Sequence, residues 1–302
     1  MTIIQSANEE ECIITTVDNV ILQATLFVPP TAEVAILVSG GTGIPRRIYR
    51  KMGEYFASRN AVVLTYDYRG LDSCGGATFD ASNVNYWDWG KFDMSAAAAL
   101  LSSRFPDLKL VHIAHSAGAH FVGLMPNHQL VSRHIFVCAG SGFWRTHHLR
   151  NWLKEMYFWW ILGPVCLARW GYIPPVGGWR GRALPEKVFR TWRRWCHQRD
   201  YFKNDMTGPM APTFYDQVSA PILAWIPTDD PIATPKSVAE INRFYDVADI
   251  ETVFVEPAHF EQPDLGHDGV FRRNVPEIWQ EWLDWLLKDV DMRLETADHK
   301  GS

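Results

Sequence analysis

The stretch that decides the fold reads Leu-Lys-Leu-Val-His-Ile-Ala-His-Ser-Ala-Gly over residues 108–118, with the serine at position 116. Its apolar first half predicts a buried strand over residues 108–114, and the residues from 117 to about 124 predict a helix. A sharp strand-to-helix turn at Ser116 needs small residues two positions away, and Ala114 and Gly118 meet that need. Such a turn exposes the serine Oγ at a helix N-terminus, where free N–H groups stabilise developing negative charge. A serine that only caps a helix gives the same pattern, so a nucleophilic Ser116 needs partners elsewhere in the chain.

Apolar runs alternate with helical stretches on both sides of this turn. The chain begins with a predicted hairpin, and strands and helices then follow each other. Strands alternating with helices predict an α/β fold, a mostly parallel sheet with helices on both faces. The predicted hairpin covers residues 11–17 and 20–28; the other strands cover 34–39, 61–66, 108–114, 132–138, 221–226 and 250–255; the helices cover 47–59, 91–103, 117–124, 235–245 and 274–288.

The alternation breaks between residues 142 and 218, where aromatic, basic and Pro/Gly-rich pieces show no strand–helix rhythm. A long insertion after a mid-sheet strand predicts a helical cap over the carboxyl ends of the strands, the edge where such sheets bind ligands. We therefore expect a core from residues 1–141 and 219–290, a cap from 142–218 and a polar tail from 291–302.

Two later loops offer partners for Ser116. Asp229 and Asp230 follow the predicted strand at 221–226, and His267 stands between Gly266 and Gly269 in Gly-His-Asp-Gly. The order serine, aspartate, histidine is that of the triad in this kind of fold, with the acid orienting the base. Asp230 is favoured because it directly precedes a Pro-Ile turn, and Asp229 stays open as the alternative. His259 is the rival base, but it lacks glycine neighbours.

An oxyanion hole requires two backbone N–H donors. Ala117, directly after the serine, is expected to supply one. The Gly-Gly-Thr-Gly loop at residues 40–43 is expected to supply the other, from Gly41 first and Thr42 next, because glycine lets the backbone approach a ligand closely. Thr42 and His115 are expected to line the substrate site. A phosphate cradle is disfavoured because neither Gly-rich nucleotide motif is present.

With these residues in view, the chain resembles the α/β-hydrolase superfamily over roughly residues 20–288. More narrowly, it resembles bacterial predicted hydrolases related to the serine-aminopeptidase-like (S33, lysophospholipase-like) branch. The resemblance implies a Ser–His–Asp hydrolase that uses no metal and no organic cofactor, and it fixes no substrate. It rests on the segments VSGGTG (38–43), YDYRG (66–70), HSAG (115–118), TDDP (228–231) and GHDG (266–269).

Two positions depart from the family pattern. Asp72 stands where the family often has glycine, and Ser39 stands where many relatives have histidine.

In the turn after residues 61–66, we expect Asp67 and Arg69 to pin the loop through a charge-assisted hydrogen bond. Asp93 is expected to be a simple first-turn helix acid.

The composition of the predicted cap is unusual. Eight of the 14 tryptophans lie in it, and residues 142–200 hold eleven Lys and Arg against three Asp and Glu. Three interpretations compete: a self-packing lid with basic residues in water, an aromatic pocket with a cationic rim, and a patch that contacts anionic lipid. Trp144 and Trp192 are the candidate substrate contacts.

The whole chain sets broader bounds. Its 302 residues carry a net charge of −5, which argues against nucleic-acid binding. Five scattered cysteines predict reduced thiols and no zinc site. The start lacks a signal-peptide pattern, and the apolar run at 156–168 is too short to span a bilayer, so we expect a cytoplasmic protein. A homodimer is left open.

These observations predict a serine hydrolase that cleaves a carboxylic ester, or a related acyl bond, through an acyl-enzyme. The expected partner is a small-molecule acyl substrate that is hydrophobic or aromatic. An acyltransferase or thioesterase would use the same triad. A hydrolase-fold protein that binds a small ligand without turnover is the alternative from another class.

Overall fold

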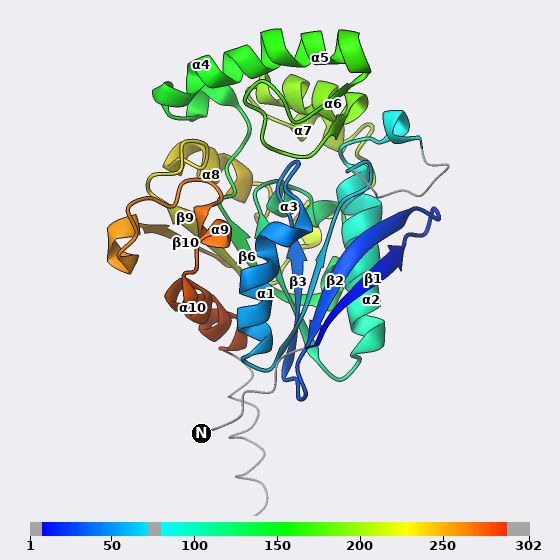
Figure 1. Ribbon diagram of the computed structural model, residues 1–302, viewed down its shortest axis with the longest axis vertical. Helices are drawn as coiled ribbons and strands as arrows, with labels where there is room; N and C mark the ends of the chain where they lie inside the picture. Colours follow the sequence, from blue (N-terminus) through cyan, green and yellow to red (C-terminus); the bar gives the residue numbers. More distant parts are fainter. Residues whose placement is uncertain (1–7, 72–79, 289–302) are drawn as a thin grey trace, which may run out of the picture.

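The computed structural model describes residues 8–71 and 80–288, and Figure 1 shows a central sheet with helices on both of its faces. The eight strands are ordered β1-β2-β4-β3-β5-β6-β9-β10. β2 is antiparallel to both neighbours, and the pairings from β4 to β10 are parallel. The strands are β1 (Asn8–Thr15), β2 (Ile21–Val28), β3 (Val34–Ser39), β4 (Ala61–Tyr66), β5 (Lys109–His115), β6 (Val131–Val137), β9 (Ile222–Pro227) and β10 (Ile250–Val255). The predicted mostly parallel sheet is confirmed.

The inner strands read as continuous apolar runs because helices cover both faces of the sheet. Every residue of β3, β4 and β9 is buried. In β3, Val34, Ile36 and Val38 pack in the same core as α1 (Arg50–Ala57) and α10 (Pro276–Leu287). Ala35 and Leu37 point the other way, into the core that contains α2 (Ser95–Arg104) and the end of α8 (Pro235–Asn242).

The order of the strands places two loops side by side. β3 pairs with β4 on one side and with β5 on the other, so the chain reverses its direction of travel across the sheet between them. The loops after β3 and β5 therefore leave the sheet at adjacent positions on its carboxyl edge, where α/β sheets bind ligands. The short helix α3 (Ala117–His120) follows β5 directly.

The chain between β6 and β9 lies over this edge. It contains α4 (Leu149–Tyr157), the π-helical η7 (Phe158–Leu162), α5 (Gly163–Trp170), the strand pair β7 (Tyr172–Ile173) and β8 (Leu184–Pro185), α6 (Glu186–Cys196) and α7 (Lys203–Met206). In Figure 1, α4 and α5 run end to end along the top of the molecule, with α6 and α7 between them and the sheet. We call residues 142–218 the insertion.

α4, η7 and α5 form one long helix that the sequence did not reveal. A proline inside a helix lacks an N–H donor and clashes with the preceding turn, so Pro164 is unexpected in a helix of this length. Here Pro164 stands in the first turn of α5, directly after the π-helical segment. A widened turn of this kind is a place where a helix tolerates proline. No helix among residues 8–71 and 80–288 is long and apolar enough to cross a membrane.

Several helices begin or end at other residues than the sequence predicts. The helix expected at 47–59 begins with a 3-10 turn and ends at Ala57, the one expected at 91–103 begins with a π-helical segment, and the one expected at 117–124 is split in two. The remaining elements are η1 (Arg46–Tyr49), η2 (Ala81–Asn83), η3 (Trp89–Met94), η4 (Val122–Leu124), η5 (His128–Leu130), η6 (Trp144–Thr146), η8 (Tyr215–Gln217), η9 (Pro257–Phe260) and α9 (Gly269–Arg272).

The turn after β4 is held by ion pairs that differ from the expected one. The Arg69 guanidinium donates to Asp93, at 2.7 Å, and to Asp18, at 2.6 Å, whereas Asp67 accepts from Arg46. The sequence predicts Asp93 to be a simple first-turn helix acid, but it lies in η3, before α2, and its fully buried carboxylate is the partner of Arg69. A buried pair satisfied by several hydrogen bonds fixes this loop against the start of α2. Asp72 and the predicted tail at 291–302 lie outside the described residues.

Candidate active site

The turn at Ser116 has the backbone conformation of a strained strand-to-helix turn. Ser116 has φ 51° and ψ −112°, values that a residue other than glycine rarely adopts. The close approach of α3 to the loop after β3 explains Gly118, since a Cβ atom there would lie 2.6 Å from the carbonyl oxygen of Ser39. The turn thus holds the serine Oγ above the carboxyl edge of the sheet.

His267 and Asp230 complete a hydrogen-bonded chain with this serine. His267 Nε2 lies 3.0 Å from Ser116 Oγ, and His267 Nδ1 lies 2.8 Å from Asp230 Oδ2. A carboxylate only accepts hydrogen bonds, so Nδ1 carries the imidazole proton and Nε2 is free to accept the serine proton. This is the arrangement of nucleophile, base and orienting acid in a Ser–His–Asp triad.

The acid and the base of this chain stabilise each other's charged forms. Burial opposes the charge on Asp230, but His267 and the N–H groups of Ile232 and Ala233 outweigh burial and lower the pKa of this carboxyl. Burial likewise opposes a charged His267, yet the Asp230 carboxylate raises the pKa of the imidazole above its ordinary value. The protonated form of His267 is therefore stabilised by its contact with Asp230.

The structure separates the two neighbouring aspartates. Asp230 contacts the His267 imidazole, while the Asp229 carboxylate accepts the backbone N–H groups of Leu265 and Gly266 at 3.0 and 2.9 Å. Asp229 therefore holds the loop that carries the histidine. The rival base His259 is exposed in η9, where its ring packs on Phe260.

The Gly-rich loop after β3 lies next to the serine turn, but one of its amides already has a partner. The Gly41 N–H donates to the Tyr49 hydroxyl at 3.1 Å. The Thr42 hydroxyl is hydrogen-bonded to the Tyr86 hydroxyl. Within the described part of the chain, the backbone N–H groups of Thr42 and Ala117 have no hydrogen-bond partner. Of the three predicted oxyanion donors, Gly41, Thr42 and Ala117, these two are therefore the unpaired ones.

His115 links this loop to the loop of the base. Burial, with the nearby charge of His267, lowers the pKa of His115 to about 3, so its ring is neutral. Its Nε2 lies 2.9 Å from the backbone carbonyl of His267, which only accepts, so Nε2 carries the proton. Nδ1 must then accept from the Tyr49 hydroxyl, 2.8 Å away, and the Tyr49 oxygen in turn accepts from Gly41. Sequence reasoning missed Tyr49.

The matches to known proteins agree with this fold. The profile of the "Alpha/beta hydrolase family" matches residues 35–281. The chain belongs to the alpha/beta hydrolase family. The matched segment includes Ser116, Asp230 and His267. The narrower resemblance to the S33 branch stays a prediction.

Three solved structures show how the fold of this alpha/beta hydrolase compares. A soluble variant of monoglyceride lipase from Saccharomyces cerevisiae has a TM-score of 0.66 at 13% identity, with 94% of this chain and 96% of that one covered. An esterase from Pyrococcus furiosus has a TM-score of 0.59 at 17% identity, with coverages of 93% and 91%. The α/β hydrolase GrgF from a Penicillium species has a TM-score of 0.55 at 16% identity, with coverages of 93% and 98%. A search of curated sequences finds no match.

The insertion of this hydrolase contacts the Gly-rich loop directly. The Arg182 N–H donates to the carbonyl of Gly43 at 2.7 Å. Gly43 has φ +70°, and a Cβ atom there would lie 2.5 Å from the Trp179 ring. The predicted contact residue Trp192 belongs to an aromatic cluster with Trp179 and reaches the Tyr86 ring at 6.3 Å.

Trp144 lies in a different part of the insertion. Its ring packs edge-on against Trp152 at 4.7 Å, and the Arg145 guanidinium covers it. The structure thus brings Trp192 toward the Gly-rich loop and leaves Trp144 in a separate ring pair.

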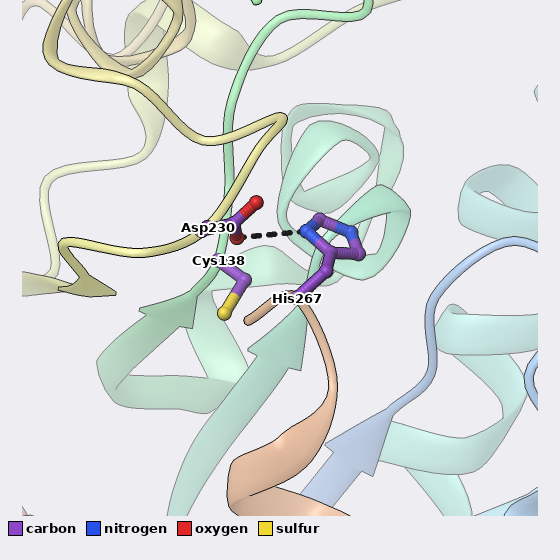
Figure 2. A group of neighbouring side chains, drawn as sticks. All are labelled: Cys138, Asp230 and His267. Atoms are coloured by element: carbon purple, nitrogen blue, oxygen red, sulfur yellow. Dashed lines mark hydrogen bonds and ion pairs between the residues drawn. The ribbon is translucent and has the colours of Figure 1, made fainter. Parts of the chain in front are cut away.

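A cysteine that the sequence did not single out lies beside the triad. Figure 2 shows Cys138, at the end of β6, next to Asp230 and His267, and the ligand atoms of the three lie within 4.8 Å of one another. Three such residues could hold a metal ion, but the donors do not suit one. Burial raises the pKa of the Cys138 thiol, while a metal requires the thiolate. Both His267 nitrogens are already hydrogen-bonded, to Asp230 and Ser116.

Proposed function

We propose that this alpha/beta hydrolase is a serine hydrolase that cleaves a carboxylic ester through an acyl-enzyme. The proposal rests on one observation, the continuous chain from Ser116 Oγ to His267, at 3.0 Å, and from His267 to Asp230, at 2.8 Å. The nucleophile, its base and the acid that orients the base therefore stand in reacting order.

In the proposed reaction, His267 takes the Ser116 proton as the oxygen attacks the ester carbonyl. The Ala117 N–H and an amide of the Gly-rich loop stabilise the oxyanion. We propose Thr42 for the second donor, because the Gly41 amide is bonded to Tyr49. The imidazolium then gives its proton to the leaving alcohol, and water, activated by the same histidine, hydrolyses the acyl-enzyme.

We further propose that the insertion acts as a cap and that the acyl group is hydrophobic or aromatic. Tyr86, which holds Thr42, is part of a ring cluster that continues into the insertion through Trp192 and Phe158. Aromatic side chains of this kind line many pockets for apolar ligands. Thioester cleavage and acyl transfer remain alternatives, because the same triad serves them.

Labelling with a small fluorophosphonate tests the triad, with Ser116→Ala and His267→Ala variants beside the parent protein. We expect the parent to be labelled at Ser116 and both variants to stay unlabelled. A folded parent that a small probe fails to label would contradict the proposal and favour a ligand-binding protein. In that case, a ligand should raise the melting temperature of Ser116→Ala without any turnover by the parent.

A second experiment separates hydrolysis from acyl transfer. The parent is given a set of p-nitrophenyl esters and matched thioesters, with and without a competing amine or alcohol. Free acid as the sole product, with a preference for oxygen esters, supports the proposal. Acylated acceptor as the main product, or a strong preference for thioesters, would assign the alternative activity.

A further inference from the structure

The long helix of α4, η7 and α5 presents an apolar outer face. From Leu149 to Val165 the exposed apolar side chains recur three or four positions apart, the spacing of one side of a helix, and Trp170 follows at the end of α5. Most of them are more than half exposed, which is unusual for large apolar residues that follow one another along an element. They are Leu149 (72%), Leu153 (84%), Tyr157 (42%), Trp160 (56%), Ile161 (57%), Val165 (58%) and Trp170 (45%).

The charges on this face are all positive. Lys154 and Arg169 are exposed beside the apolar residues, whereas the guanidinium of Arg150 donates to the backbone carbonyl of Asp229 in the core, at 2.7 Å. Glu155 is the single acid of the helix, and its carboxylate is bound to His147 at 2.6 Å and to Asn151. Among the ion pairs of the described residues, none neutralises Arg150, Lys154 or Arg169. We call these exposed apolar and basic residues of residues 149–170 the outer face.

A basic hollow of about 390 Å³ adjoins the outer face at Trp160. Arg190 and Arg194 on its wall are paired with Glu186 and Asp205. Arg193 stacks over the Trp160 ring at 5.1 Å and has no carboxylate partner among the described residues. The one hydrogen bond of its guanidinium among the described residues is to the Trp159 carbonyl, at 3.3 Å, so an anionic group near Trp160 would meet a cation whose charge no carboxylate offsets. The hollow is lined by Trp160, Arg190, Thr191, Arg193, Arg194 and His197.

From these observations we infer that the outer face docks on an anionic lipid bilayer. A helix that lies in the membrane interface inserts its apolar side chains below the lipid headgroups and places its cationic side chains among the lipid phosphates. The outer face offers both kinds of side chain. A second copy of the chain fits less well, because a twofold contact would bring together the Lys154 and Arg169 cations of two outer faces that carry no free carboxylate to offset them.

The position of the outer face determines which side of the protein would face the bilayer. Figure 1 shows α4 and α5 on the side of the insertion that faces away from the sheet. The net charge of the chain is −5, so the rest of the protein would be repelled by the same bilayer. The inner side of the insertion meets the Gly-rich loop through Arg182 and Gly43. This inference goes beyond the proposed function and does not depend on it.

Vesicle co-sedimentation tests the inference with the full chain. The vesicles are phosphatidylcholine alone, or phosphatidylcholine with about a third phosphatidylglycerol, at low and high salt. We expect binding to the anionic vesicles that weakens at high salt. Leu153→Asp with Ile161→Asp should lower the affinity at least tenfold, and Lys154→Gln with Arg169→Gln should reduce its salt dependence. Val247→Asp, at a half-exposed apolar residue far along the chain from the outer face, is the matched control and should bind like the parent.

Three results would overturn the inference. The parent fails to bind anionic vesicles, the double aspartate variant binds as well as Val247→Asp, or the parent is a dimer that the double aspartate variant converts to a monomer without any vesicle binding. Melting temperature and fluorophosphonate labelling show that each variant is folded. Because labelling reports only on Ser116, failure of the triad proposal and failure of the docking inference remain distinguishable.

Discussion

At the scale of single residues, the proton positions around Ser116 follow from the chemistry of the groups that surround His115. A neutral imidazole carries one proton. Because His115 uses this proton to donate to a carbonyl through Nε2, its Nδ1 can only accept a hydrogen bond from the Tyr49 hydroxyl. Tyr49 therefore donates to His115 and accepts from Gly41. The tyrosine is fully buried, so neither partner can turn to water if the hydroxyl is removed.

Tyr49→Phe should lower kcat roughly tenfold and cost about 1–3 kcal/mol of stability, because it leaves a buried amide and a ring nitrogen unpaired. Steady-state kinetics and urea unfolding measure the two effects. Tyr55→Phe, in α1 directly after η1, removes a hydroxyl that bonds Gln280 away from the site, and it should leave kcat unchanged. If Tyr49→Phe instead raises kcat, the released Gly41 amide is itself an oxyanion donor, and the assignment to Thr42 is wrong.

The two adjacent aspartates should respond very differently to the same substitution. Asp230→Asn removes the acceptor that fixes the His267 tautomer and should lower kcat by roughly 10³- to 10⁴-fold. Asp229→Asn replaces a carboxylate that accepts two backbone N–H groups, so it should lower stability by about 1–3 kcal/mol and kcat far less. Kinetics on one ester with both variants makes the comparison. Equal losses of kcat would contradict the division of roles.

The sequence predicts the residues that come together at Ser116 but not those that support them. Ser116, Asp230 and His267 follow strands of one sheet, and the carboxyl ends of parallel strands meet at one edge. Tyr49 appears in the sequence only as an apolar-face residue of a helix, and Cys138 only as the last residue of an apolar run. Their contacts join segments far apart in the chain, which no local pattern encodes.

At the scale of elements, the inner strands of the sheet were predictable to within one residue because both of their faces are buried, whereas the edge strand β1 begins three residues before its predicted start. Burial on two sides requires a continuous apolar run, which the sequence displays directly. Helix starts were less predictable, because the 3-10 turn before α1 and the π-helical segment before α2 arise from tertiary packing. The insertion was the least predictable part, since Pro164 interrupts the pattern of its longest helix.

Gly43→Ala tests the contact between the insertion and the Gly-rich loop. A Cβ atom at Gly43 would lie 2.5 Å from the Trp179 ring, so the insertion must shift. Gly178→Ala is a control with a similar backbone cost, because Gly178 also has a positive φ, +96°, but has open space around it. Alanine at Gly43 should lower kcat/KM at least tenfold more than alanine at Gly178 and change tryptophan fluorescence. Equal effects would mean that backbone strain alone explains the loss.

At the scale of the whole molecule, buried neutral histidines tie folding to pH. Burial lowers the pKa of His115, His120 and His134 to about 3, and it also lowers that of His112. The unfolded chain binds protons at these sites below the ordinary value of 6.5, while the folded chain does not. The stability they provide is therefore complete above pH 6.5 and is lost as pH falls toward 3.

Unfolding in urea at pH 8, 6.5 and 5 should show this loss, with each such histidine contributing up to about 1.4 kcal/mol per pH unit. His134→Asn isolates one of them, because the amide keeps a polar group near Nδ1, which faces His112 at 3.1 Å, but cannot titrate. The variant should show a smaller difference in unfolding free energy between pH 8 and 5. An unchanged difference would mean that other groups cause the loss.

The aromatic core of the insertion is continuous with the core of the sheet, since Phe202 stacks on Phe244 at 4.5 Å and Trp195 stacks on Tyr86 at 5.4 Å. The insertion is therefore not a segment that can be exchanged between proteins of this fold without loss of packing. A chimera that grafts residues 142–218 onto another protein of this fold would leave both halves of each ring pair without a partner. Successful transplants would have to carry Tyr86, Phe244 and Tyr245 with the segment, so changes in specificity should arise by substitution within the insertion more readily than by its replacement.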